Sequence, residues 1–585
     1  MEFHYASEKN VQLMLALLKA NHIKKVIVSP GATNVSLVAS MQYDSYFELY
    51  SCVDERSAAY MACGMAVESG EIVVLSCTGA TSSRNYLPGL TEAYYRHIPI
   101  LAITSSMPTV NVGHLFPQCT DRSTPPVDTV RASYCIESIK DSTDEWDRTV
   151  KINMAISELT RNGGGPVHIN LITRGCSDYS VLKLPVVKEI HRIRYNDSFP
   201  NLEGRKTLVF IGERFKWTKK DIRALDDFCS TYNTVCLCDH TSGYKGKYRV
   251  QSALLASQEK GYEQSLFTCD VLIHIGGISG DYYTMGAIKA NEVWRVDEDG
   301  EMRDKFGKLS FIFEMPINEF FSHYAGPNDS CDNKLLSDFK KASNLLLDKL
   351  PDLPFSNTWI ASQICKEIPD GAEIHLGILN SLRSWNFFEV PDSVSLFCNV
   401  GGFGIDGILS TMIGASLCNK SKIYYAVLGD LAFFYDINSI GNRNISPNIR
   451  ILLINNGRGV EFHTYKHGAS KFGDDTDKYI AAYGHNGRQS PNLVKDIASA
   501  LGFEYLTASS KTEFNKVKHQ FLSKIISDKP IIFEVFTERD NDADVLRLIR
   551  QDNGVAKKSF KQGLYDIAES IMGKNVVKSL SSIVK

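Results

Sequence analysis

The sequence lacks the paired motifs that would place its cysteines or histidines in a disulfide scaffold or a structural metal site. Its 14 cysteines are scattered over 585 residues, none stands as Cys-x-x-Cys, and the closest pair is Cys236 and Cys238. Disulfide scaffolds are shorter and denser in cysteine, and zinc sites use paired ligands at tight spacing. The 14 histidines show no His-Glu-x-x-His pattern. We therefore expect free, buried thiols in a reducing cytoplasm.

An excess of one charge and long apolar runs are also missing. The 64 Lys and Arg residues are balanced by 67 Asp and Glu residues, which excludes the electrostatic footprint of a nucleic-acid coat or a polybasic membrane binder. No apolar run reaches the about 18 residues of a transmembrane helix. No basic segment followed by an apolar core opens the sequence, so no signal peptide is expected. With 43% hydrophobic and 22% charged residues, we expect a folded cytoplasmic protein without nucleic-acid or membrane partners.

Apolar, strand-like runs alternate with helical stretches along most of the chain, a pattern typical of parallel α/β sheets. Val11, Met14 and Leu15 recur at helical spacing and predict a helix over 8–20. Buried strands are predicted at or within 25–28, 72–75, 98–103, 163–171, 208–212, 235–238, 271–277, 373–376, 423–428, 449–454 and 530–535. The fold class is therefore α/β, with consecutive parallel-sheet domains.

Polar and proline-containing stretches divide the chain into three α/β domains joined by linkers. The predicted domains are 1–185, 206–325 and 357–545, with linkers at 186–205 and 326–356 and a helical tail at 546–585. The tail is basic and amphipathic but has few aromatic residues. Because binding of single-stranded nucleic acid relies on aromatic stacking, a solvated helical cap is the favoured interpretation of the tail.

Two polar motifs each follow a strongly apolar strand. Gly429-Asp430-Leu431-Ala432 comes first, and Asn455-Asn456 follows Asp430 by 25 residues. Parallel sheets bind ligands at the carboxyl ends of their strands, and carboxylate and amide oxygens are ligands for Mg²⁺ or Ca²⁺. A helix that begins at Asp430 would direct its N–H groups at a phosphate. The pattern favours a metal-bridged diphosphate, and a loop carboxylate with turn-forming asparagines is the alternative.

This order of motifs resembles the thiamine diphosphate-dependent enzymes of the pyruvate-decarboxylase and acetolactate-synthase type. Glu55 leads into an alanine-rich helix, as the essential glutamate of that family does. Thr78-Gly79 with Asn85 resembles the family's Thr-Gly loop, and 165–171 resembles the close of its first domain. The resemblance covers most of 1–185 and 356–540. It implies a pyrimidine-binding domain, a central Rossmann-like domain and a diphosphate-binding domain.

The resemblance also implies a cofactor and a metal. Glu55 would hydrogen-bond the pyrimidine ring of thiamine diphosphate, and Ile405 would wedge the cofactor into its bent shape. Asp430, Asn456 and the carbonyl of Arg458 would hold Mg²⁺, or Ca²⁺ or Mn²⁺ in its place. The expected cofactor-binding residues are Glu55, Thr78, Gly79, Asn85, Asn380, Ser381, Gly404, Ile405, Gly429, Asp430, Leu431, Ala432 and Asn456.

The segment behind the Asn-Asn pair is expected to face the reacting carbon. Glu55 and His463 are the two expected catalytic residues, and His463 would be a proton donor. Lys466 would anchor a carboxylate or phosphate. Polar residues on a solvated helix remain an equal alternative for this segment. The expected substrate residues are Thr33, Asn34, Gln118, Arg383, His463 and Lys466.

The resemblance implies decarboxylation of a 2-oxo acid and transfer of the acyl-anion equivalent to an acceptor carbonyl or enone. The protein would then be a carboligase, classed as a transferase or lyase, and an obligate homodimer or dimer of dimers. The acceptor is expected to be a keto-sugar or nucleotide sugar. A simple 2-oxo acid decarboxylase, a non-catalytic cofactor-binding subunit and a plain nucleotide-binding protein remain alternatives.

Within the family, several stretches of the sequence are most similar to a carboligase that joins a 2-oxo dicarboxylate to isochorismate. That enzyme uses arginines to bind these acidic substrates. One of its arginines follows a Ser-Pro-Gly turn, where this chain has Thr33 and Asn34, and another is replaced by Val400. A third has only Arg383 near it, at a different spacing. Each charge-assisted contact is worth about 1.5–3 kcal/mol. We therefore expect another reaction with a small donor such as pyruvate, and the reaction of that carboligase is the alternative.

Overall fold

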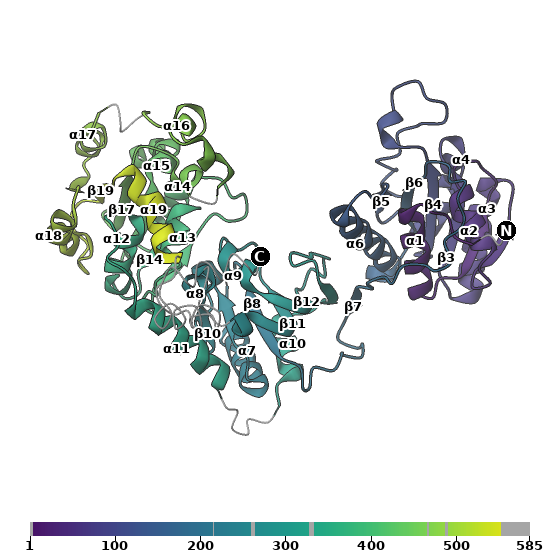
Figure 1. Ribbon diagram of the computed structural model, residues 1–585, viewed down its shortest axis with the longest axis horizontal. Helices are drawn as coiled ribbons and strands as arrows, with labels where there is room; N and C mark the ends of the chain where they lie inside the picture. Colours follow the sequence, from purple (N-terminus) through teal and green to yellow (C-terminus); the bar gives the residue numbers. More distant parts are fainter. Residues whose placement is uncertain are drawn as a thin grey trace, which may run out of the picture. The chain divides into compact units, whose positions relative to one another are not determined.

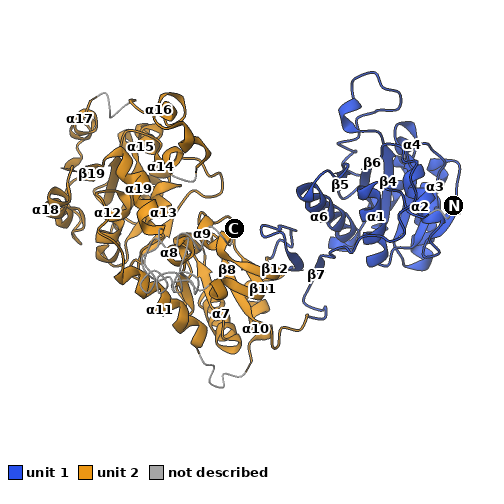
Figure 2. Ribbon diagram, viewed as in Figure 1, with its two compact units in different colours: residues 1–199, 298–314 blue, residues 200–297, 315–585 orange. Residues whose placement is uncertain are grey.

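The computed structural model describes residues 4–214, 216–258, 264–326, 333–464, 467–485 and 490–550 (Figure 1). Its strands form three parallel sheets flanked by helices, which confirms the predicted α/β class. The chain divides into two compact units: unit 1 holds residues 1–199 and 298–314, and unit 2 holds 200–297 and 315–585 (Figure 2). No described helix is long and apolar enough to cross a membrane.

Unit 1 is built on a six-stranded parallel sheet in the order β2-β1-β3-β4-β6-β5. Successive side chains of a strand point to opposite faces, so Leu101 and Ile103 pack on one side with α1 and α6, while Ala102 packs on the other with α3 and α5. The strands are β1 (Lys25–Val28), β2 (Glu48–Ser51), β3 (Val73–Thr78), β4 (Ile100–Ser106), β5 (Ser133–Ile136) and β6 (Val167–Ile172), and β7 (His191–Ile193) pairs with β13 (Leu309–Phe313). The helices are α1 (Lys9–Ala20), α2 (Val35–Gln42), α3 (Glu55–Ser69), α4 (Thr81–Asn85), α5 (Leu87–Tyr95) and α6 (Ser142–Glu158).

The first part of unit 2 carries parallel strands in the order β10-β9-β8-β11-β12. They are β8 (Thr207–Ile211), β9 (Cys236–Cys238), β10 (Arg249–Gln251), β11 (Thr268–Ile275) and β12 (Lys289–Val296). Their helices are α7 (Lys219–Tyr232), α8 (Ala253–Ser257), α9 (Tyr282–Ala287), α10 (Ile317–Tyr324) and α11 (Lys334–Asp348).

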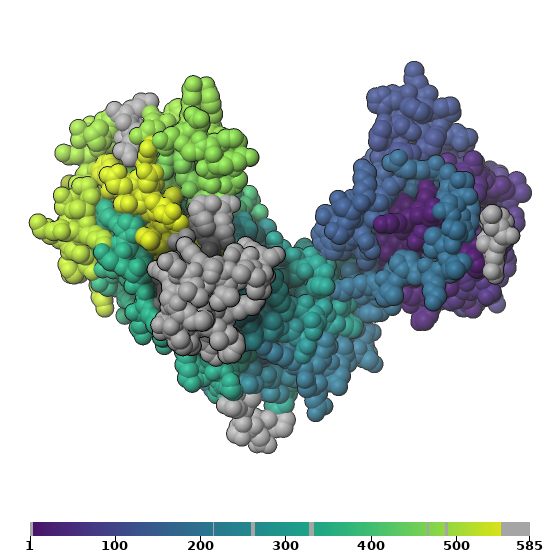
Figure 3. All heavy atoms as spheres, viewed as in Figure 1, coloured from purple at the N-terminus to yellow at the C-terminus, as the bar shows by residue number. Residues whose placement is uncertain are grey.

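The second part of unit 2 is a six-stranded parallel sheet in the order β15-β14-β16-β17-β19-β18. Its strands are β14 (Glu373–Leu376), β15 (Ser395–Phe397), β16 (Tyr424–Gly429), β17 (Ile449–Asn455), β18 (Glu504–Ala508) and β19 (Ile531–Phe536). Its helices are α12 (Asn357–Ile364), α13 (Asn380–Trp385), α14 (Ile408–Cys418), α15 (Asp430–Tyr435), α16 (Asp475–Tyr479), α17 (Leu493–Ala500), α18 (Lys511–Phe521) and α19 (Arg539–Arg550). In Figure 3 the yellow helix α19 lies at the surface of unit 2, and it contacts α12.

The predicted helix at 8–20 and all of the predicted strands are present, within one to three residues at most ends. The domain boundaries stay predictions. Three elements lie inside a predicted linker or cross a predicted boundary. Strand β7 lies inside the predicted first linker, helix α11 lies inside the second, and α19 runs through the predicted boundary at 545. The rest of the predicted tail, 551–585, lies outside the described residues. Every described cysteine is a free thiol, and seven are buried.

Candidate functional site

In unit 1, the predicted catalytic glutamate stands at the first position of a helix. The Asp54 side chain caps α3 by accepting a hydrogen bond from the Ser57 N–H at 2.7 Å. Glu55 is partly buried, and its Oε2 accepts a hydrogen bond from the Asn85 amide at 3.3 Å. Two residues that the motifs predicted separately, Glu55 and Asn85, therefore lie in contact.

The turn at Thr78 brings the ends of three strands together. The Thr33 hydroxyl donates to the Ser105 carbonyl at 2.6 Å and contacts the Thr78 hydroxyl. Gly31 packs so closely that a Cβ there would lie 2.6 Å from the Thr78 Cβ. Thr33 and Thr78 thus form one polar edge at the carboxyl ends of β1, β3 and β4, where a parallel sheet places ligands.

Two other predicted substrate residues of unit 1 lie in different surroundings. Asn34 is buried, and its amide donates to the Ser29 carbonyl at 3.0 Å and to the Ser76 hydroxyl at 3.3 Å. Those bonds occupy Asn34 in holding β1 to β3. Gln118 is exposed and has a positive φ of 62°. Its role as a substrate residue stays a prediction.

In unit 2, the two polar motifs lie at the ends of neighbouring strands. Strand β16 ends at Gly429 and β17 at Asn455, and the parallel register pairs Gly429 with Ile454. Asp430 and Asn456 are each 4% exposed. The register therefore brings the two motifs to neighbouring strand ends at the same edge of the sheet.

A buried carboxylate that sequence reasoning missed sets the orientation of Asn456. Asp542 of α19 is fully buried and accepts hydrogen bonds from the Asn456 amide at 3.0 Å, the Thr537 hydroxyl at 2.6 Å and the Asn357 N–H at 2.6 Å. Burial raises the pKa of Asp542, against the effect of these bonds. Because the amide nitrogen is bound to Asp542, the Asn456 oxygen points the other way, where it accepts from the Arg458 N–H at 3.3 Å.

These residues fit a divalent cation and a diphosphate. Asp430, Asn456 and the Arg458 carbonyl offer the hard oxygen ligands that Mg²⁺ prefers. The Asn380 side-chain oxygen at the start of α13 is buried and has no hydrogen-bond partner among the described residues. Ser381 beside it accepts from the Asn357 amide at 3.1 Å. A buried polar atom without a partner marks a place for a group from outside the chain.

Ile405, which is predicted to hold the cofactor in its bent shape, and Gly404 precede helix α14. Ile405 is partly buried and packs against the hydrophobic core of the third sheet. Gly404 is exposed, and Gly407 adopts a positive φ of 79° where α14 begins. After β16, Leu431 is partly buried and Ala432 is buried. The cofactor contacts of these residues stay predictions.

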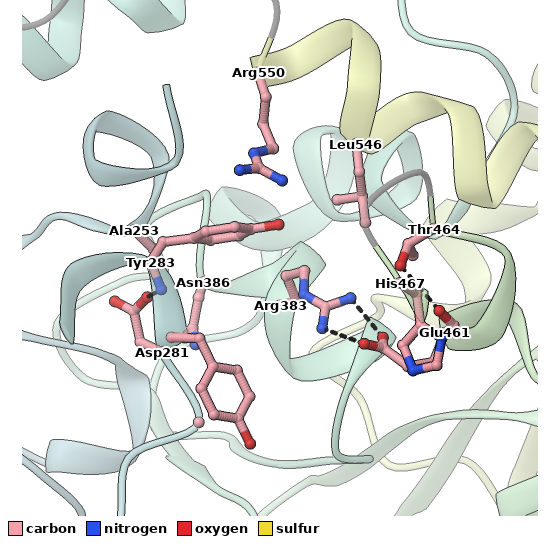
Figure 4. Close-up of a pocket in the computed structure, with 12 residues that line it drawn as sticks. Ala253, Asp281, Tyr283, Arg383, Asn386, Glu461, Thr464, His467, Leu546 and Arg550 are labelled. Carbon is pink, nitrogen blue, oxygen red and sulfur yellow. Dashed lines mark hydrogen bonds and ion pairs between the residues drawn. The ribbon is translucent and has the colours of Figure 1, made fainter. Parts of the chain in front are cut away.

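A cavity of about 200 Å³ in unit 2 lies among α9, α13, the segment after Asn456 and the end of α19 (Figure 4). Arg383 and Glu461 form a two-fold ion pair on its wall, with nitrogen–oxygen distances of 2.7 and 3.0 Å. The Arg550 guanidinium lies 4.8 Å from the centre of the Tyr283 ring. The positive charge of Arg383, a predicted substrate residue, is therefore neutralised by a residue of its own chain.

The predicted proton donor belongs to a second ionic cluster. His463 Nε2 lies 2.7 Å from a carboxylate oxygen of Asp477. The same carboxylate is paired with Arg458 at 3.2 Å and with Arg539 at 3.1 Å. His463 is therefore held by an acid that two arginines share. The predicted anchor Lys466 lies outside the described residues.

Comparison with known proteins identifies the class first. Residues 9–124 match the family model described as the thiamine pyrophosphate enzyme N-terminal TPP-binding domain. The chain is thus related to the thiamine diphosphate-dependent enzymes, which confirms the resemblance drawn from its motifs, and the cofactor of that class is thiamine diphosphate with a divalent metal.

Individual relatives match nearly the whole chain. Three are named 2-succinyl-5-enolpyruvyl-6-hydroxy-3-cyclohexene-1-carboxylate synthase. The protein from Bacteroides thetaiotaomicron is 29% identical over 93% of this chain and 98% of its own length, and that from Phocaeicola vulgatus is 28% identical over the same shares. The Porphyromonas gingivalis protein is 27% identical over 94% of this chain and 97% of its own length. The relatives give no support to the expectation of a diverted reaction and favour the alternative.

Proposed function

We propose that this thiamine diphosphate-dependent enzyme decarboxylates a 2-oxo acid and transfers the acyl-anion equivalent to an acceptor, with the reaction named in its relatives as the first candidate. The observation that carries the proposal is the pairing of Asp430 and Asn456 at adjacent strand ends, with the Asn456 amide bound by buried Asp542. The Bacteroides thetaiotaomicron and Phocaeicola vulgatus relatives named as the synthase each cover 93% of the chain, which supports the same reaction here.

When bound, thiamine diphosphate supplies the electron sink for decarboxylation. The Asp430 carboxylate, the Asn456 oxygen and the Arg458 carbonyl would bind the metal that holds its diphosphate. Glu55, held by Asn85, would bind the pyrimidine ring and stabilise the tautomer that accepts a proton. Thr78 would contact the cofactor and Thr33 the donor substrate at the end of the first sheet, and His463 would move a proton to or from the acceptor.

The ion pair of Arg383 and Glu461 favours a second candidate, in which the donor or acceptor differs from that of the relatives. A guanidinium already bound by two carboxylate oxygens has little capacity left for a substrate carboxylate. The polar groups around this cavity then suit an uncharged, hydroxylated acceptor such as a keto-sugar or the sugar of a nucleotide sugar.

A panel of substrate pairs tests both candidates. The purified chain with thiamine diphosphate and Mg²⁺ is incubated with 2-oxoglutarate plus isochorismate, pyruvate plus sugar acceptors, and each donor alone. Released CO₂ and product mass are read together. Efficient formation of the succinyl-cyclohexene product supports the first candidate, and turnover of pyruvate alone or with a sugar supports the second. Absence of CO₂ from every donor would leave only a cofactor-binding subunit.

A further inference from the structure

Arg122 of unit 1 is a partly buried cation whose hydrogen bonds go to neutral groups. Its Nη1 donates to the Thr104 hydroxyl at 2.8 Å and its Nη2 to the Asn170 amide oxygen. No ion pair joins Arg122 to a carboxylate in the ranges that the structure describes. Burial lowers the pKa of Arg122, which shows that its surroundings disfavour the charge they enclose. Buried charges in proteins are usually paired, so this one calls for an anion from outside unit 1.

The groups behind Arg122 supply dipoles but no negative charge. The Thr104 hydroxyl lies 2.7 Å from His168 Nε2, and the Ser133 hydroxyl lies 2.8 Å from His168 Nδ1. Burial, reinforced by Arg122, lowers the pKa of His168 to about 3, so this imidazole is neutral at physiological pH. The Thr104 hydroxyl accepts from Arg122 and shares a further hydrogen bond with His168. The network orients the guanidinium without neutralising it.

A cavity of about 70 Å³ opens beside this network, between α5, β4 and the segment 121–130. Its polar lining includes Arg122, Thr104 and His168, and its apolar lining comprises Leu87, Leu90, Pro125, Pro126 and Val130 among others. Asp121 also lines it, but one of its carboxylate oxygens already accepts from the Ser123 N–H at 2.9 Å and hydroxyl at 2.7 Å. The cavity therefore combines the partly buried Arg122 with an apolar wall, and the exposed Arg84 and Asp121 also line it.

We propose that this cavity binds a small carboxylate, with its charged end on Arg122 and its short hydrocarbon part against the apolar wall. A guanidinium presents paired N–H groups that match a carboxylate. The volume equals about two water molecules at roughly 30 Å³ each, which suits a ligand of acetate or pyruvate size. A phosphate would gain nothing from the apolar wall.

The site adjoins the turn where we place the cofactor. The Arg122 Nη1 atom lies 3.1 Å from the position that a Cβ of Gly79 would occupy, so the bare glycine makes room for the guanidinium. A carboxylate on Arg122 would thus lie near Thr78 and Gly79. This carboxylate is either the donor 2-oxo acid or a separate effector. Only the first interpretation rests on the proposed function.

The test measures binding to the full chain rather than turnover. Unfolding temperature and heat of binding are recorded with sodium acetate and sodium pyruvate, against sodium chloride at equal ionic strength. Wild type should show saturable stabilisation, and Arg122→Gln should weaken it at least tenfold. Arg96→Gln, at an exposed arginine of unit 1 outside the cavity lining, is the matched control and should bind as wild type does. Equal stabilisation in Arg122→Gln, tighter binding of phosphate, or no saturable effect in wild type would overturn the proposal.

Arg122→Lys covers the case in which the glutamine variant does not fold. Lysine keeps the charge but loses the paired N–H groups, so binding should weaken without being abolished, and unchanged binding would also overturn the site. Steady-state kinetics of the holoenzyme distinguish the two possible ligands, the donor 2-oxo acid and a separate effector. A raised KM for the donor with a smaller change in kcat identifies the donor, whereas lost carboxylate binding at unchanged KM identifies an effector. Because binding is read without turnover, its outcome is independent of the proposed reaction.

Discussion

At the scale of single residues, the site consists of side chains whose orientation is set by a second residue far away in the sequence. Asn456 is turned by Asp542, 86 positions later, and Glu55 is held by Asn85, 30 positions later. Each supporting bond removes a rotamer choice from a residue to which we assign a chemical role. Function at this scale therefore depends on the supporting residues as well as on the motif residues.

We expect Glu55→Gln to retain thiamine diphosphate and to lose turnover by about 10²–10⁴-fold, the usual contribution of a positioned proton-transfer group. Glutamine keeps the size of the side chain and an oxygen for the Asn85 amide, but it cannot take part in proton movement. Cofactor titration and CO₂ release measured on the same preparation check this. Wild-type turnover in the variant would remove Glu55 from the mechanism.

Asp430→Ala should instead lose metal and cofactor together, because it removes an expected Mg²⁺ ligand. Calorimetric titration with thiamine diphosphate, with and without Mg²⁺, measures the loss. An unchanged unfolding temperature of the apo protein would show that the alanine left the fold intact. Metal-dependent cofactor binding at wild-type strength in this variant would contradict the assignment of Asp430 as a ligand.

The buried carboxyl of Asp281 should make folding depend on pH. Burial raises its pKa to about 6, and the charged form is disfavoured in the fold. The protonated carboxyl contributes fully to stability below about pH 4, and about 3 kcal/mol is lost as the pH rises through 6. Asp281→Asn keeps an oxygen for the Tyr283 and Thr284 N–H groups. The variant should therefore gain stability over wild type as the pH rises from about 4.5 to about 7.5, in denaturant titrations.

Asp44→Asn is the control of opposite sign. Burial raises the pKa of Asp44, but hydrogen bonds from Lys19 and Tyr5 outweigh it and leave the pKa lowered. A carboxyl whose pKa is lowered in the fold stabilises it at pH values above the pKa of the unfolded state, and this stabilisation is lost as the pH falls. The difference in the free energy of unfolding between Asp44→Asn and wild type should therefore shrink towards low pH. If the difference in stability between Asp281→Asn and wild type does not change with pH, the prediction that the buried Asp281 carboxyl has a raised pKa is contradicted.

At the scale of helices and strands, interior elements differ from edge elements in how readily a pattern reveals them. The predicted strands that lie inside the first and third sheets are mostly apolar. In β4 and β17 every residue is buried, because both faces are covered by helices. In those two sheets the strands missed by the pattern, β2, β5, β15 and β18, are the outer strands. They are short and partly exposed, so their sequences carry no continuous apolar run.

The close approach of α3 and α5 should make Gly89 intolerant of a side chain. A Cβ at Gly89 would lie 2.5 Å from the Ala59 Cβ and 2.9 Å from the Ala59 carbonyl carbon. We expect Gly89→Ala to lower the free energy of unfolding by about 1–3 kcal/mol, the usual cost of overpacking. Gly286→Ala in α9, where nothing lies within 4 Å, should instead be neutral or gain about 0.5–1 kcal/mol. Urea titrations compare them, and equal stability of the two variants would show that α3 and α5 can separate without cost.

At the scale of the whole molecule, the exposed face of α3 favours the predicted homodimer or dimer of dimers. Tyr60, Met61 and Val67 are 49%, 44% and 56% exposed; Tyr60 and Val67 lie two turns apart on one face, and Met61 adjoins Tyr60. Exposed apolar patches of this kind mark interfaces. We expect Tyr60→Ser with Met61→Ser to shift the protein towards monomers in sedimentation and to lower activity with it. Val186→Ser, at an isolated exposed valine, should leave the assembly unchanged. A monodisperse, active wild-type monomer would contradict the prediction.

The sequence alone determined the α/β class, the interior strands of the first and third sheets and the two polar motifs at Asp430 and Asn456. These are readable because burial repeats with the period of each element, and because a short motif keeps its chemistry close together along the chain. The packed structure decided which distant side chains meet. Asp542 turns Asn456, Glu461 neutralises Arg383, and Arg122 lies against Gly79 without an ion pair among the described residues. No periodicity encodes such pairs, because they form only when segments tens of residues apart are packed against one another.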